Sequence, residues 1–159
     1  MLLKTIKDLS EKVFIIGKLE TALARFNDGF ACSQVVLAAF APQLGMSEEI
    51  AIKIAGAFGG GVARRGDTCG AVNAAFMVIG LKYADNCLNR QATKKAYTIV
   101  REFVNSFETL NGSIVCRDLI NCDISTSQGF TYAKDNQLFN KLCPKFIQDS
   151  IEILDRLIE

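Results

Sequence analysis

The sequence has no histidine among its 159 residues. Mechanisms that depend on an imidazole are therefore excluded, including Ser-His-Asp and Cys-His nucleophile pairs, Cys₂His₂ zinc sites and histidine-ligated haem. An excess of charge of either sign is also lacking, because 18 Lys and Arg residues nearly balance 17 Asp and Glu residues and give a formal net charge of +1. This balance argues against an extended binding surface for nucleic acid or for an anionic membrane.

Long hydrophobic runs are missing as well. The uncharged stretch at residues 68–81 has 14 residues, whereas a membrane-spanning helix needs about 20 apolar residues. Near the N-terminus the longest apolar run is Val13 to Ile16, which is shorter than the apolar core of a secretory signal peptide. We therefore expect a cytoplasmic protein without membrane association. In that compartment cysteines serve as metal ligands, catalytic thiols or core residues more often than in permanent disulfides.

The hydrophobic pattern predicts an all-α fold in a single domain, residues 1–159. With 50% hydrophobic and 22% charged residues, the chain can bury a substantial core. Apolar residues recur at helical spacing nearly throughout, and no linker, repeat or low-complexity tract divides the chain. We expect a bundle of about five to seven helices. Eight large apolar residues are predicted to be mostly buried: Phe40, Phe58, Phe76, Ile79, Phe103, Phe107, Ile147 and Leu154.

Local signals predict where several of these helices begin. Ser47, followed by two glutamates, is typical of a helix start, and Thr68 is expected to cap the helix after a glycine-rich segment. Pro144 fits the first position of the last helix. Ser125 with Gln128 has the spacing of a capping box, which is a structural feature only.

The six cysteines are the residues with the most chemical potential: Cys32, Cys69, Cys87, Cys116, Cys122 and Cys143. No two of them form a Cys-x-x-Cys pair, which argues against thioredoxin-like, rubredoxin-like and zinc-ribbon sites. Four are expected near helix N-termini, where free N–H groups and the helix dipole favour the thiolate. We expect these four to converge on one site as catalytic residues or metal ligands: Cys32, Cys69, Cys116 and Cys143. The alternative is that they are small core residues.

The segment 59–71 combines a run of glycines with two arginines and Cys69. It is not a P-loop, because no Gly-Lys-Ser/Thr sequence closes it. The arginines are expected to lower the pKa of Cys69, so we predict this residue to be the most reactive thiol. The predicted cofactor-binding residues are Gly59, Gly60, Gly61, Arg65 and Gly70. The alternative is a tight interhelical turn with solvated arginines.

Several short segments together resemble a known bacterial and archaeal family. They are residues 29–34, 58–61, 69–72, 80–83, 112–116 and 142–144. From about Leu23 to Leu157 the chain resembles the C_GCAxxG_C_C family, small proteins to which a redox activity is ascribed. The family cysteines correspond to Cys32, Cys69, Cys116 and Cys143, while Ala74 replaces the glycine that closes the motif. Because members tend to be encoded near oxidoreductases or transporters, the resemblance implies a redox partner protein or a small oxidoreductase system.

Three functions are compatible with these residues. In the first, Cys69 is the attacking thiolate of a thiol–disulfide protein, and another of the four cysteines resolves the mixed disulfide. In the second, the four thiolates bind an iron–sulfur cluster for electron transfer, or a zinc ion in a closed site. In the third, the domain is a packing or binding module whose thiols carry out no chemistry.

Overall fold

The centre of the fold is helix α2 (Cys32–Phe40), in a computed structural model that describes residues 2–84 and 90–158. Seven of the nine α2 residues are buried. A helix that is apolar on all sides needs neighbours on all sides. Accordingly, α2 packs against four other helices: α1 (Leu2–Asn27), α3 (Glu48–Ala55), α4 (Gly70–Tyr83) and α8 (Leu138–Leu157).

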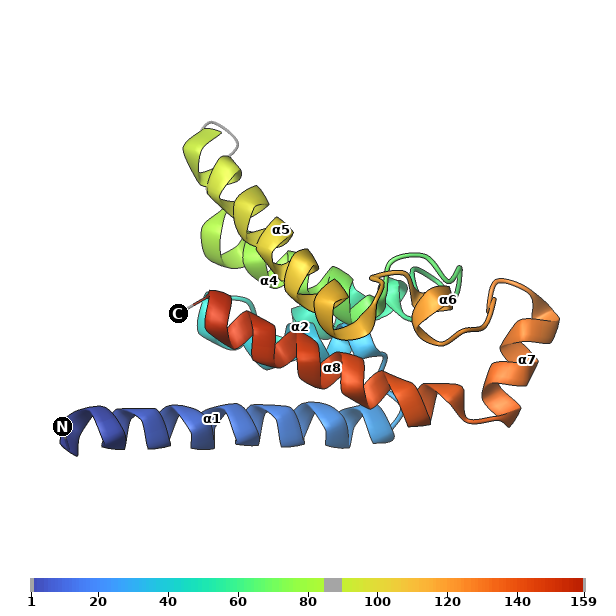
Figure 1. Cartoon of the computed structure of the whole chain (residues 1–159), viewed down its shortest axis with the longest axis horizontal. Coiled ribbons are helices and arrows are strands. Elements are labelled where there is room, and N and C mark those ends of the chain that lie inside the picture. The colour runs from blue at the N-terminus through green and yellow to red at the C-terminus, as the bar shows by residue number, and fades with distance from the viewer. Residues whose placement is uncertain (1, 85–89, 159) are drawn as a thin grey trace.

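Helices α4 and α5 (Arg90–Asn111) run side by side in opposite directions, above α8 in the view of Figure 1. Three alanines of α4 are completely buried and let neighbouring helices approach closely: Ala71, Ala74 and Ala75. A row of aromatic rings then connects α4 with α5 and α8. The ring centroids lie 6.2 Å apart for Phe76 and Phe103, 5.9 Å for Phe103 and Phe107, and 6.3 Å for Phe107 and Phe146.

The shorter elements complete the fold. They are η1 (Pro42–Leu44), η2 (Gly56–Phe58), α6 (Cys116–Leu119) and α7 (Ser127–Asp135). Figure 1 shows α6 and α7 at the end of the molecule opposite the N-terminus, next to the start of α8. The only extended pairing among residues 2–84 and 90–158 is an isolated antiparallel bridge between Thr68 and Val115.

The all-α prediction is confirmed. The described part of the chain contains eight α-helices, seven of which have eight or more residues, and no strand. Six of the eight residues predicted to be mostly buried are buried, whereas Phe58 and Phe76 are only partly buried. Phe58 ends η2 just before an exposed loop, which leaves part of its ring uncovered. None of the described helices is long and apolar enough to cross a membrane.

One of the predicted helix starts is correct. Ser47 caps α3, where its hydroxyl accepts a hydrogen bond from the Ile50 N–H at 3.3 Å. The prediction for α4 is wrong by one residue, because Cys69 occupies the N-cap position. Thr68 instead pairs with Val115 in the bridge, which keeps its backbone extended.

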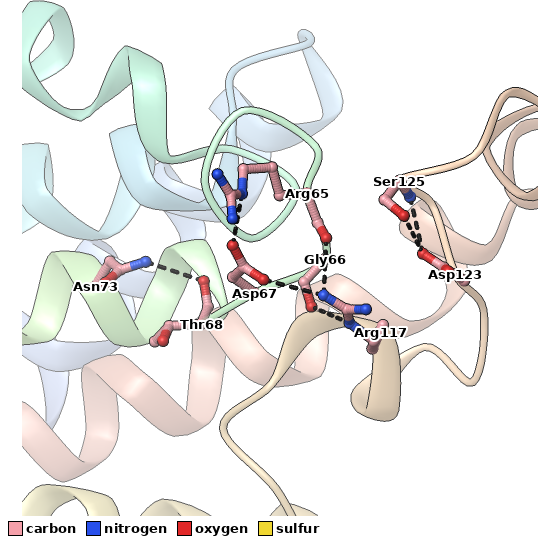
Figure 2. Close-up of polar contacts among 8 residues, drawn as sticks. All are labelled: Arg65, Gly66, Asp67, Thr68, Asn73, Arg117, Asp123 and Ser125. Atoms are coloured by element: carbon pink, nitrogen blue, oxygen red, sulfur yellow. Dashed lines mark hydrogen bonds and ion pairs between the residues drawn. The ribbon is translucent and has the colours of Figure 1, made fainter.

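The cap of α7 also differs from the prediction. Thr126 occupies the N-cap position, and its hydroxyl accepts a hydrogen bond from the Gly129 N–H at 3.0 Å. Ser125 bonds to Asp123 through both its N–H and its hydroxyl, at 3.0 and 2.6 Å (Figure 2). The capping box predicted for Ser125 and Gln128 is therefore absent, because the nearer carboxylate of Asp123 takes the Ser125 side chain.

Pro144 lies inside α8 and not at its start. The helix begins at Leu138, after Gln137 in a left-handed conformation with φ 55°. A proline inside a helix removes one backbone hydrogen bond. Burial offsets this cost, because Leu138 and Leu142 pack against the core. Cys143 consequently lies within a helix and not at a helix N-terminus.

Candidate functional site

Four cysteines that lie far apart in the sequence line one cavity: Cys32, Cys69, Cys116 and Cys143. Cys32 is the first residue of α2, Cys69 directly precedes α4, Cys116 is the first residue of α6, and Cys143 lies within α8. All four are buried. The cavity has a volume of about 470 Å³, which is within the range of small-molecule sites. The structure thus brings these four residues together as expected from the sequence, whereas their roles as catalytic residues or ligands stay predictions.

The other two cysteines are not part of this lining. Cys122 is half-buried, and its thiol donates a hydrogen bond to the carbonyl of Gly129 at 3.3 Å. Cys87, which the sequence predicts to lie away from the other cysteines, lies outside the described residues.

Two polar residues of α2 fix the position of Cys32. Cys32 is the first residue of α2. The Ser33 hydroxyl donates to the carbonyl of Ala55 at 2.8 Å, and the Gln34 amide donates to the carbonyl of Ile52 at 3.0 Å. These bonds connect the first turn of α2 with α3. The sequence analysis missed this role, although two polar residues directly after a cysteine in an apolar helix were the available signal.

The bridge between Thr68 and Val115 positions Cys69 and Cys116. The Cys69 N–H donates to the carbonyl of Ile114 at 2.8 Å, and the Cys116 N–H donates to the carbonyl of Asp67 at 2.7 Å. Each cysteine therefore takes part in the pairing through its own backbone. A shift of one segment would move both thiols.

The side chain of Arg117 binds residues 65–67, in the loop that follows the glycine run, as Figure 2 shows. Its guanidinium donates to the carbonyls of Gly66 and Arg65, each at 3.1 Å, and to the carboxylate of Asp67 at 3.0 Å. The other oxygen of Asp67 accepts from Arg65 at 2.8 Å. Arg65 is therefore paired with a carboxylate, and it does not contribute to the pKa of Cys69. The expectation that Arg65 activates Cys69 is wrong.

The loop has an unusual backbone. Five consecutive residues, Gly60 to Arg64, have φ between 52° and 65°. Left-handed geometry costs about 1–2 kcal/mol for each residue that carries a Cβ. Gly61 is required at its position, because a Cβ there would lie 2.6 Å from both the Asp67 carbonyl oxygen and the Cβ of Cys116.

Only some of the predicted cofactor-binding residues line the cavity. Gly59 and Gly60 line it, whereas the other three do not: Gly61, Arg65 and Gly70. Arg64 lines it in place of Arg65. The sequence analysis also missed the apolar wall, which comprises Phe26, Leu119, Ile120, Phe130, Phe139 and Phe146.

Cys32 and Cys69 are joined by a hydrogen bond between their side chains. This bond, followed by the N–H groups of Ser33, Ala71 and Gly60, lowers the pKa of Cys32 to about 7 in spite of its burial. The same bond raises the pKa of Cys69 well above its usual value, and burial and the negative charge of Cys32 add to this effect. Cys32 is therefore the thiolate and Cys69 is the donor.

Burial dominates at the remaining two thiols. It raises the pKa of Cys116 to about 12, with a further contribution from the charge of Cys32. It also raises the pKa of Cys143 far above the usual range. A lowered pKa is thus observed only for Cys32, because the hydrogen bond from Cys69, together with the backbone N–H groups of Ser33, Ala71 and Gly60, outweighs the loss of solvation at its sulfur.

The arrangement of ligands bears on the metal hypotheses. In the part of the chain that the structure describes, no group of three or more Cys, Asp or Glu side chains is placed to hold one metal ion. This geometry does not support a closed zinc site. An iron–sulfur cluster spreads four thiolates around a larger group. Four cysteines around one cavity are a donor set of that kind.

A family model described as "Putative redox-active protein (C_GCAxxG_C_C)" matches residues 30–157. The chain belongs to this family. The C_GCAxxG_C_C region contains all four cavity cysteines and every helix from α2 to α8, whereas all of α1 precedes it. No curated protein and no solved structure gives a significant match to the chain.

Replacing Gly70 tests the packing behind the Cys32 sulfur. A Cβ at Gly70 would lie 2.7 Å from the Cys32 sulfur and 2.9 Å from the carbonyl oxygen of Phe58. We expect Gly70→Ala to lower the free energy of unfolding by about 1–3 kcal/mol. Gly80→Ala in the same helix is the control, because nothing lies within 4 Å of its Cβ; it should raise stability by about 0.5–1 kcal/mol. Urea unfolding measures both, and equal stabilisation by the two changes would contradict this packing.

The pKa order predicts which thiol is alkylated first. Cys32 should react with iodoacetamide faster than the other cavity cysteines, at a rate that rises with pH around a midpoint of about 7. Cys69→Ala should move this midpoint upward because the thiolate loses its main hydrogen-bond donor. Peptide mass spectrometry across a pH series measures each site, with Cys122→Ser as the control that leaves the midpoint in place. Faster alkylation of Cys69 than of Cys32 would refute the order.

Proposed function

We propose that the protein carries out thiol–disulfide exchange, with Cys32 as the attacking thiol and Cys69 as the resolving thiol. The observation that carries this proposal is that Cys32 and Cys69 are both buried and line one cavity of small-molecule size, where the interaction between the two thiols is the largest cause of the pKa shift of each. An attacking thiol is most effective when its pKa is close to the ambient pH. The pKa of Cys32 of about 7 meets this condition at neutral pH.

The proposed reaction proceeds in two exchanges. The Cys32 thiolate attacks one sulfur of a substrate disulfide, and the S–S bond of the substrate breaks. One half of the substrate leaves as a thiolate, and the other half stays bound to Cys32 as a mixed disulfide. Cys69 then attacks the Cys32 sulfur, its proton passes to the leaving thiolate, and the second substrate thiol is released. The net result is one reduced substrate disulfide and one Cys32–Cys69 disulfide. A redox partner protein or oxidoreductase system that donates a dithiol restores the reduced protein.

The raised pKa of Cys69 suits a resolving thiol. Its largest causes are the bond to Cys32 and burial, and the negative charge of Cys32 adds to them. Once Cys32 is part of a mixed disulfide, its sulfur carries no negative charge and the hydrogen bond from the Cys69 thiol to it weakens. Cys69 then loses its proton more readily at the stage when it is needed as a nucleophile.

Trapping the mixed disulfide tests this proposal. In a Cys87→Ser, Cys122→Ser background, the reduced protein should release two equivalents of thiopyridone from neutral dithiodipyridine and form the Cys32–Cys69 disulfide. Cys69→Ser should stop after one equivalent with the adduct on Cys32, because the proposed resolving thiol is absent and burial keeps Cys116 and Cys143 protonated. Cys32→Ser should slow release by about tenfold or more. Mass spectrometry identifies the adduct, and an undiminished second equivalent from Cys69→Ser would overturn the assignment.

An iron–sulfur cluster is the second candidate, and the number of cavity cysteines favours it. Exchange needs two thiols, yet Cys116 and Cys143 line the same cavity. Backbone N–H groups also reach the Cys32 sulfur, and hydrogen bonds of this kind to ligand sulfurs tune cluster potentials. Cys32, Cys69, Cys116 and Cys143 would hold the cluster, which supplies one-electron transfer when bound.

Two serine variants separate the candidates. If the thiols carry out exchange, Cys116→Ser and Cys143→Ser should each keep the two-equivalent release, and anaerobically purified protein should be colourless. If the four cysteines hold a cluster, iron and acid-labile sulfide should copurify with the protein, and either variant should lose them as fully as Cys32→Ser does. Iron and sulfide analysis with a visible spectrum measures this outcome.

A further inference from the structure

Besides the thiols, the cavity wall is mostly apolar and contains one charged side chain, Arg64. No acidic side chain lines the cavity, and Arg64 is its only basic residue. The other large polar side chain in the wall, Gln34, is already used: its amide oxygen accepts from the Ala31 N–H at 2.9 Å, and its nitrogen donates to Ile52. Arg64 is therefore the group in the wall that is available to a polar ligand.

Arg64 is held toward the cavity. Its guanidinium carbon lies 4.4 Å from the centre of the Phe130 ring, and Phe130 in turn lies 6.1 Å from Phe139, measured between ring centroids. All three residues line the cavity. Arg64 ends the left-handed run, which depends on Gly60, because a Cβ there would lie 3.0 Å from the Cα of Arg64. Strained backbone that persists in a fold points to a functional requirement.

The neighbouring arginine provides a contrast. Arg65 pairs with Asp67 at 2.8 Å, whereas Arg64 forms no ion pair with any described residue. Arg64 is also exposed to solvent while it lines the cavity, so it lies at the rim. One such cation over the Phe130 ring, which itself packs against Phe139, matches a ligand with an aromatic body and an anionic group.

We propose that the cavity takes aromatic disulfides that carry a carboxylate, with the carboxylate on Arg64 and the aromatic body against Phe130 and Phe139. This inference rests on the proposed exchange function and names its substrate class. Arg64 is a specificity-determining residue in this reaction. The Cys32 thiolate attacks the nearer sulfur of the bound disulfide, the S–S bond breaks, and the aromatic thiolate leaves.

Two reagents that differ in charge test the proposal. Dithiobis(nitrobenzoate) is an aromatic disulfide with carboxylates, and dithiodipyridine is a neutral one. Arg64→Gln should slow the reaction of Cys32 with the anionic reagent by about threefold or more, while its rate with the neutral reagent changes little. The neutral reagent also reports any change in Cys32 itself. Arg64→Lys, which keeps the positive charge, should restore most of the selectivity.

Arg65→Gln is the matched control, because it removes the same charge one residue away and outside the cavity wall. It should leave the ratio of the two rates unchanged. An equal fall in the ratio for Arg64→Gln and Arg65→Gln would overturn the proposal, since it would show only a long-range effect of charge. An unchanged ratio in Arg64→Gln would overturn it as well. Failure of Cys32 to react with the neutral reagent in the parent protein would instead reject the exchange function.

Discussion

The site depends on how Arg117 and the bridge at residues 68 and 115 close the glycine-rich loop. The loop contains three consecutive left-handed residues with a Cβ, Val62, Ala63 and Arg64, at a cost of about 1–2 kcal/mol each. Backbone hydrogen bonds inside the loop and three bonds from Arg117 offset this strain. Since the same pairing carries the backbones of Cys69 and Cys116, the closed loop and the cavity form together.

Mutual repulsion limits the charge that the four thiols can carry. The negative charge of Cys32 raises the pKa values of Cys69, Cys116 and Cys143. Burial acts in the same direction, because a second thiolate would be removed from solvent. At neutral pH the cavity therefore holds at most one thiolate among its four sulfurs. Both candidate functions start from this state, since exchange uses the single thiolate and a cluster needs the other three protons to leave.

Much of the fold could be predicted because it depends on local sequence. The spacing of apolar residues predicted the helices, and Ser47 predicted the start of α3, because its own side chain caps that helix. Pro144 misled because its local preference for a helix start is weaker than the burial of Leu138 and Leu142, which lie six and two residues before it. Local signals fail where a residue's neighbours along the chain contribute less free energy than its contacts in the fold.

The chemistry of the site was predicted less well, for the same reason. Cysteine position identified the four cavity residues, yet the thiolate is Cys32, because N–H groups of Ala71 and Gly60 from other segments reach its sulfur. The choice between Arg64 and Arg65 depends on the left-handed backbone, which no composition rule predicts. The two adjacent arginines therefore lie in different environments: Arg64 lies over the Phe130 ring, and Arg65 pairs with the Asp67 carboxylate.

The exposed position of Arg64 at the cavity rim has a chemical consequence. A guanidinium in contact with the thiolate would lower its pKa further, and a thiolate of lower pKa is a weaker nucleophile. Here the sulfur is stabilised by a thiol and N–H groups, which carry no net charge, while the cation lies at the exposed rim. An anionic ligand would be repelled by the single thiolate, and a cation at the rim compensates for this repulsion at the ligand's far end. Under the proposed exchange function, neutral ligands need no such compensation, so the charge at the rim would select among disulfides by their charge and leave the Cys32 sulfur unchanged.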